Sequence, residues 1–228
     1  HVSPEDTIHE VKRLTGRMVA INLEPATIKN NDEESVWNLT AGRQATVDNA
    51  RKAADMGVDM IVLTGNPGVG VDNEAIIQAL SKLKDAVGDR VILTAGKMHA
   101  SGIISEAGEK ILTEKDIVDF IDAGADVILL PAPGTVPGIT MEYAGKLIKK
   151  AHEKGALAMT TIGTSQEGAD EDTIRQIALM CKMAGADIHH IGDSGYMGMA
   201  LPENITAYSV AIRGKRHTYR RMAMSLLR

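Results

Sequence analysis

The chain has 228 residues, of which 44% are hydrophobic, enough to bury one large core without a second domain. We therefore expect a single domain over residues 1–228. The net charge of −5 argues against nucleic acid or an anionic membrane as a partner, and no apolar run approaches the length of a membrane span. The single cysteine, Cys181, excludes an internal disulfide and indicates a reducing, cytoplasmic setting.

The first predicted element is a helix near the beginning of the sequence. Ser3 is predicted to cap this helix, Pro4 to occupy its first position, and Glu5 and Asp6 to lie at its positive end. An α/β domain rarely begins on a helix without a preceding strand. We therefore expect further elements upstream of His1.

A helix that ends in glycine, followed at once by an apolar strand, recurs six times along the chain. Three of these junctions are nearly identical, with the sequences MGVDMIVL, AGADVILL and AGADIHHI. Each glycine stands where a left-handed C-cap is expected. The predicted strands are Met18–Glu24, Asp59–Gly65, Arg90–Lys97, Asp126–Ala132, Ala156–Gly163 and Asp187–Asp193. The predicted helices between and after them are Thr46–Met56, Asn73–Val87, Glu114–Ala123, Met141–Lys154, Glu171–Ala184 and a last helix within Leu201–Leu227.

Strict alternation of strands and helices predicts an α/β fold, either an open doubly wound sheet or a barrel. No dinucleotide-type glycine cluster follows the first strand, and polar residues stand at the carboxyl ends of many strands, which favours the barrel. Six strands and a leading helix predict a (β/α)₈ TIM barrel whose first two strands are absent from this chain. A six-stranded flavodoxin-like sheet is the alternative.

Several long strings of the sequence resemble an uncharacterised bacterial TIM-barrel family. They are INLEP (21–25), LTGNPGVGV (63–71), AGKMHASG (95–102), LLPAPGTVPGIT (129–140), IGTSQEGADE (162–171), HHIGDSGYMG (189–198) and IRGKRHTYRRMA (212–223). Members of that family are often labelled haloacid dehalogenase-like hydrolase or phosphoenolpyruvate phosphonomutase. They carry about two further strands upstream, and their reaction is not established. The resemblance therefore implies a fold rather than a chemistry.

The residues support both labels only in part. A haloacid dehalogenase needs a nucleophilic aspartate in a D-x-D motif after its first strand, but the triplet at 170–172 opens a helix. Gly192-Asp193-Ser194 does resemble a later metal-binding element of that superfamily. The phosphonomutase label implies a Mg²⁺-dependent lyase, for which Glu24 and Asp193 are acids at strand ends, while the paired acids of the middle strands are missing. A divalent metal such as Mg²⁺ on Glu24 and Asp193 is one hypothesis for a cofactor.

Three side chains at the carboxyl ends of the early strands are candidates for catalysis, because a barrel carries its active site at that end. Glu24 is either a metal ligand or general base, or a rim carboxylate paired with a lysine or arginine. Lys97 and His99 share one face. A buried lysine there would bind an anion or form a Schiff base, and the histidine would act as its acid–base neighbour.

The last predicted strand carries two histidines of opposite parity, so only one of them can face the interior of a barrel. His190, which shares a face with Gly192, is the catalytic candidate. For one of the two, the alternative is a histidine hydrogen-bonded between strand and helix.

We expect an anion at the loops after the last two strands, because these loops are the usual phosphate site of the fold. The predicted anion-binding residues there are Gly163, Thr164, Ser165, Gly192, Ser194 and Gly195. Asn66, in the glycine-rich loop after the second predicted strand, is a further anion-binding candidate.

These residues predict an enzyme that acts on a small phosphorylated or carboxylated metabolite, with lyase or isomerase chemistry favoured over hydrolysis. The alternatives are a non-catalytic ligand-sensing barrel and a phosphatase of haloacid dehalogenase type. The expected partner is a small anionic metabolite, and a homo-oligomer stays open. The basic residues from Arg213 to Arg228 are interpreted as the solvated face of the last helix rather than an RNA site.

Overall fold

A computed structural model describes residues 3–26, 39–65, 70–99, 108–163, 166–192 and 200–224. The described strands are β1 (Ala20–Leu23), β2 (Met60–Leu63), β3 (Ile92–Gly96), β4 (Val127–Pro131), β5 (Leu157–Thr161) and β6 (Ile188–His190). The α-helices are α1 (Thr7–Thr15), α2 (Val47–Asp55), α3 (Asn73–Val87), α4 (Glu114–Asp122), α5 (Met141–Glu153), α6 (Glu171–Ala184) and α7 (Pro202–Ala223). The 3₁₀ helices among the described residues are η1 (Ala41–Arg43), η4 (Gly108–Ile111) and η5 (Gln166–Gly168).

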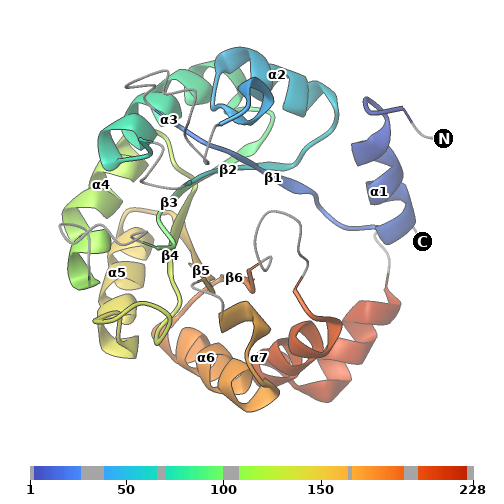
Figure 1. The fold of residues 1–228 in the computed structure, drawn as a ribbon, viewed down its shortest axis with the longest axis vertical. Coiled ribbons are helices and arrows are strands. Elements are labelled where there is room, and N and C mark those ends of the chain that lie inside the picture. Colours follow the sequence, from blue (N-terminus) through green and yellow to red (C-terminus); the bar gives the residue numbers. More distant parts are fainter. Residues whose placement is uncertain are drawn as a thin grey trace. The chain divides into compact units, whose positions relative to one another are not determined.

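Strands and helices alternate along the chain (Figure 1), and all six strands lie inside the predicted ranges. The strands form one parallel sheet in the order β1-β2-β3-β4-β5-β6. A flavodoxin-like sheet would reverse its strand order at a switch point, so the sequential order excludes that alternative. The α/β fold of the TIM-barrel class is confirmed.

The chain divides into two compact units that interleave along the sequence. The first contains residues 1–96, 119–127 and 224–228, and the second contains residues 97–118 and 128–223. Among the described helices, none is long and apolar enough to cross a membrane.

In the first unit, one face of the sheet is more covered than the other. The register pairs Asn22 with Val62 and Leu23 with Leu63, and in β1 Asn22 is exposed while Leu23 is buried. Leu63 pairs in turn with Ala95 of β3, and both are fully buried. Because side chains alternate along a strand, Leu23, Leu63 and Ala95 share the covered face.

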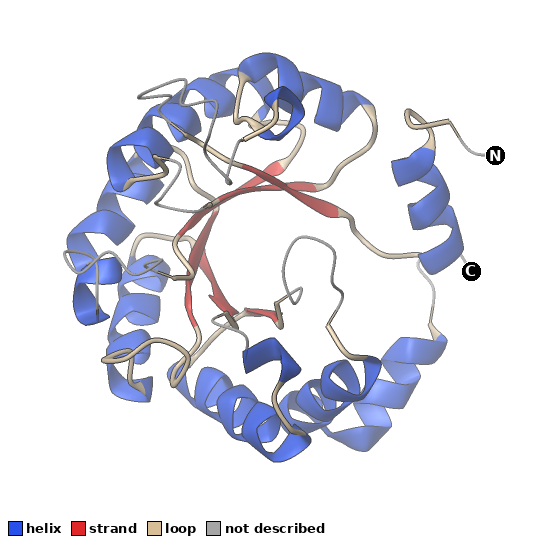
Figure 2. Cartoon of the chain, viewed as in Figure 1, coloured by secondary structure: helices blue, strands red, loops and turns tan. Residues whose placement is uncertain are grey.

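In the second unit, α6 and α7 lie side by side (Figure 2) and pack on the ends of β4 and β5. Their core cluster includes Ile162, Ile177, Cys181 and Tyr208, all buried. Burial raises the pKa of the Cys181 thiol, as expected for a cysteine packed in an apolar core.

The three near-identical junctions share an aspartate that ties one strand to the next. Each carboxylate accepts a hydrogen bond from a backbone N–H at the preceding strand and binds a basic side chain of a preceding helix. The sets are Asp59 with Val19 and Lys12, Asp126 with Leu93 and Lys84, and Asp187 with Ala158 and His152, at 2.7–3.0 Å. The repeated sequence thus has a structural role at the amino-terminal ends of β2, β4 and β6, not at the strand ends predicted to carry the site.

The predicted glycine caps are mostly left-handed. Five of the six have positive φ angles, namely Gly16, Gly57, Gly124, Gly155 and Gly185. Gly88 is the exception, with φ −60° and ψ −20°. It continues the right-handed turn of α3, so the left-handed prediction is wrong at this position.

The first helix begins later than predicted. Regular helix starts at Thr7, and residues 4–6 form a turn. The Ser3 hydroxyl accepts a hydrogen bond from the Asp6 N–H at 3.1 Å and donates to the Asp6 carboxylate at 2.8 Å. Ser3 therefore caps this turn, and Asp6 is the residue that precedes the helix.

Candidate functional site

The carboxyl ends of β5 and β6 place His190 beside two hydrogen-bond donors. His190 pairs in register with Thr161, whose hydroxyl lies 3.0 Å from His190 Nδ1. The Gly192 N–H donates to the same nitrogen at 3.0 Å. A backbone N–H can only donate, so Nδ1 is an acceptor and the hydrogen of the neutral ring is on Nε2. His190 can therefore donate a hydrogen bond through Nε2.

His189 lies on the other face of β6, against the helices. Its Nδ1 is 3.0 Å from the Tyr208 hydroxyl on α7, and the two rings meet edge to face with centroids 5.4 Å apart. Burial is the largest cause that lowers the pKa of His189, followed by Asp187, which raises it, and Arg213, which lowers it. The alternative in which one histidine is hydrogen-bonded between strand and helix is thus realised by His189.

The lowered pKa of His189 predicts a stability that depends on pH. Below about pH 6.5 the unfolded chain binds a proton that the buried ring resists, so the unfolding free energy should fall as the pH drops from about 7 to 5. Replacing His189 with asparagine should make this fall shallower, as measured by urea unfolding across that range. An equally steep fall in the variant would show that other groups cause it.

The backbone conformation and the close neighbours of residue 192 both require a glycine there. Its φ is +87°, and a Cβ there would lie 2.9 Å from both the Ile162 carbonyl oxygen and Glu167 Cβ. Its N–H is already bonded to His190. These contacts are one reason for a glycine at this position, and its predicted role in anion binding stays a prediction.

Gly163 also has a protein neighbour. A Cβ at Gly163 would lie 3.3 Å from the carbonyl oxygen of Met98. The segment Lys97–His99 therefore passes directly beside the end of β5. Within this segment Lys97 is only 3% exposed, and burial lowers the pKa of the half-buried His99. The second unit thus holds the imidazole of His99, which is neutral near pH 7, two residues after the buried amine of Lys97.

Glu24, in the first unit, is ion-paired. Its buried carboxylate accepts a hydrogen bond from Arg43, and its backbone bridges Gln44. A Cβ at Gly65 would lie 2.9 Å from Glu24 Oε2, so that glycine leaves room for the carboxylate. This arrangement matches the interpretation of Glu24 as a rim carboxylate paired with an arginine.

The metal hypothesis at Glu24 and Asp193 stays a prediction. One of the Glu24 oxygens is bonded to Arg43, and among the residues described no three histidine, cysteine or acidic side chains cluster as metal ligands. Asp193, the other predicted ligand, lies outside the described residues.

Several predicted anion-binding residues also fall in parts that the structure leaves undescribed. They are Asn66, Thr164, Ser165, Ser194 and Gly195. Their roles stay predictions.

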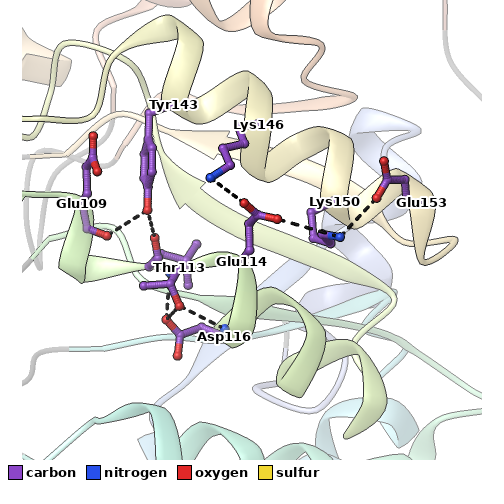
Figure 3. A network of polar contacts seen from close by, with 9 residues as sticks. Glu109, Thr113, Glu114, Asp116, Tyr143, Lys146, Lys150 and Glu153 are labelled. Carbon is purple, nitrogen blue, oxygen red and sulfur yellow. Dashed lines mark hydrogen bonds and ion pairs between the residues drawn. The ribbon is translucent and has the colours of Figure 1, made fainter.

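A polar network joins α5 to the segment that leads into α4 (Figure 3). The Tyr143 hydroxyl lies 3.1 Å from the Glu109 carbonyl oxygen and 3.0 Å from that of Leu112. Glu114 forms an ion pair with Lys146 at 2.6 Å, and this hydrogen bond lowers the pKa of the Glu114 carboxyl. These contacts anchor the chain in the second unit after residues 100–107.

The sequential parallel sheet, with helices between its strands, is that of a protein of the TIM-barrel class. The chain belongs to the family described as "Domain of unknown function (DUF7916)", which matches residues 1–228.

Solved structures with similar folds include the tetrameric deoxyribose phosphate aldolase from Aeropyrum pernix. Its TM-score is 0.58 at 16% identity, covering 93% of this chain and 81% of that one. A "putative lyase/mutase" from Burkholderia cenocepacia J2315 gives a TM-score of 0.56 at 15% identity, covering 92% and 71%. At these identities the likeness shows the fold alone.

Two curated relatives carry the name "Putative N-acetylmannosamine-6-phosphate 2-epimerase". The protein from Haemophilus influenzae is 37% identical over 89 residues, 39% of this chain and 33% of the relative. That from Actinobacillus pleuropneumoniae serotype 5b is 36% identical over 88 residues, with the same coverage. The chain thus spans about a third of the length of these relatives. None of the proteins named here carries the haloacid dehalogenase or phosphonomutase label.

Proposed function

We propose that this protein is an enzyme that acts on a small phosphorylated sugar by proton transfer, as an epimerase or other isomerase, or as a lyase. The observation that carries the proposal is His190, whose Nδ1 accepts hydrogen bonds from Gly192 and Thr161, so that the hydrogen of the neutral ring lies on Nε2 and can be donated to a substrate oxygen. Such a fixed donor stabilises charge that develops on oxygen when a neighbouring carbon loses a proton.

Lys97 and His99 supply the other groups that this chemistry needs. Because burial lowers its pKa, His99 is neutral near pH 7 and can accept a proton. Lys97 is the candidate for a Schiff base with a carbonyl substrate. The partial match to proteins named as epimerases of a sugar phosphate supports this substrate class.

In this proposal the phosphate binds at the loops that follow β5 and β6, where Thr164, Ser165, Ser194 and Gly195 remain the predicted contacts. No step is assigned to a metal. A homo-oligomer also remains a proposal, supported by the exposed Leu179 and Met183 on α6.

The proposal predicts turnover of one or more sugar phosphates that depends on His190. Hexose and N-acetylhexosamine 6-phosphates, including N-acetylmannosamine 6-phosphate, would be incubated with the protein in D₂O and followed by NMR for deuterium uptake, epimers and cleavage products. His190→Gln should lower the rate by about 10²–10⁴-fold. His217→Gln, at an exposed histidine of α7, is the matched control and should leave the rate unchanged.

Two results would contradict the proposal. Release of inorganic phosphate as the product would favour the phosphatase alternative. Binding of a sugar phosphate without deuterium uptake or product would favour the ligand-sensing barrel.

A further inference from the structure

Glu167 is a buried acid that the proposed chemistry does not use. Glu167 is only 8% exposed, and among the described residues its Oε2 has no hydrogen-bond partner. A buried carboxylate oxygen without a partner lowers stability, and such groups in folded proteins call for an explanation. A ligand that donates a hydrogen bond would provide one.

The backbone around Glu167 is held firmly. Asn204 of α7 is only 2% exposed, and its amide donates to the Glu167 carbonyl oxygen at 3.0 Å and to that of Ala169 at 2.9 Å. Gln166, the preceding residue, donates through its side chain to the Gly134 carbonyl oxygen at 3.2 Å. Hydrogen bonds from α7 and to the loop after β4 thus fix the backbone at this acid. They do not involve the carboxylate oxygen Oε2.

The side chain of Glu167 lies against the residue that orients His190. Its Cβ and Cγ would be 2.9 and 3.3 Å from a Cβ at Gly192, and the Gly192 N–H is the donor to His190 Nδ1. The stem of Glu167 and the ring of His190 therefore both lie beside Gly192, in the turn after β6. The carboxylate of Glu167 is a hydrogen-bond acceptor, and the Nε2–H of His190 is a donor. A ligand rich in hydroxyl groups offers both kinds of partner.

We infer that Glu167 is a binding residue that accepts a hydrogen bond from a hydroxyl or amide N–H of the sugar. This inference rests on the proposed function and adds how the site recognises the part of the substrate that is not phosphate. Two anions repel each other, so the phosphate does not contact the Glu167 carboxylate. The site then distinguishes a sugar phosphate from phosphate alone.

The test compares Glu167→Met with Glu203→Met, the same change at an exposed position of α7. Calorimetry would measure binding of N-acetylmannosamine 6-phosphate and of inorganic phosphate to each. Glu167→Met should weaken the sugar phosphate about tenfold or more and leave inorganic phosphate unchanged or tighter. The thermal midpoint of the ligand-free variant should not fall, because no bond of Oε2 is lost. Glu203→Met should change neither affinity.

The outcomes separate the inference from the proposed function. If the wild type binds the sugar phosphate and Glu167→Met binds it equally well, the inference is overturned while the proposed function stands. A lower midpoint of the ligand-free Glu167→Met variant would make Glu167 a structural residue, again overturning the inference. If the wild type binds no compound of the sugar phosphate panel, the proposed function and the inference fall together.

Discussion

Replacing Lys97 with methionine is expected to lower turnover of the sugar phosphate by about 10²–10⁴-fold. Methionine is close to lysine in length but lacks the amine, so it keeps the packing at a position that is 3% exposed. A buried amine that served only packing would be replaced by methionine at little cost to activity. The measurement is the initial rate on the sugar phosphate that the NMR panel identifies.

The control for this prediction is Lys149→Met, because the Lys149 side chain is 79% exposed and its ion pair with Glu153 on α5 is long, at 4.0 Å. Borohydride added during turnover would reduce a Schiff base to a stable amine, and mass spectrometry would locate the adduct. A full rate in Lys97→Met would contradict the catalytic role. A variant that loses its rate because it unfolds would show a lower urea midpoint.

The direction of Lys97 illustrates a limit of the sequence pattern. Strict alternation continued from β3 groups Lys97 with Leu93 and Ala95, on the covered face, rather than with Thr94. Because the strand ends at Gly96, this alternation need not extend to the next residue. Parity therefore leaves the assignment of Lys97 to the site as a prediction that only the variant tests.

The fold was predictable because each strand is a short apolar run placed directly after a glycine. Glycine caps such as Gly57 and Gly185 end a helix in a conformation that other residues resist, which makes the boundaries visible in the sequence. Gly88 has the same pattern but ends α3 in the right-handed region. The sequence cannot distinguish a left-handed from a right-handed helix end, because glycine adopts both conformations.

The candidate site was only partly predictable. Parity separated His189 from His190, but only the hydrogen bond to Tyr208 shows which of them faces the helices. Glu167 was missed because the loop after β5 was interpreted by its glycines and hydroxyls. Its signal, an acid beside Gly168 in the loop after a buried strand, is complete only with the hydrogen bond that Asn204 donates to the Glu167 backbone, and Asn204 lies far along the chain.

Gly192→Ala is expected to lower the unfolding free energy by about 2–5 kcal/mol. A side chain in the left-handed region costs about 1–2 kcal/mol, and forcing an extra methyl group into packed atoms costs about 1–3 kcal/mol more. Both terms apply here, because φ is +87° and the new Cβ would lie 2.9 Å from the Ile162 carbonyl oxygen. Urea unfolding measures the change.

Gly155→Ala separates these two terms. Gly155 has a similar φ of +85°, but a Cβ there would meet nothing within 4 Å. Its variant should lose only the conformational part, about 1–2 kcal/mol. The excess at Gly192 would then measure how tightly Glu167 and Ile162 enclose the turn that holds His190. Equal losses at the two glycines would mean that this turn yields easily, and that the ring of His190 is not held by it.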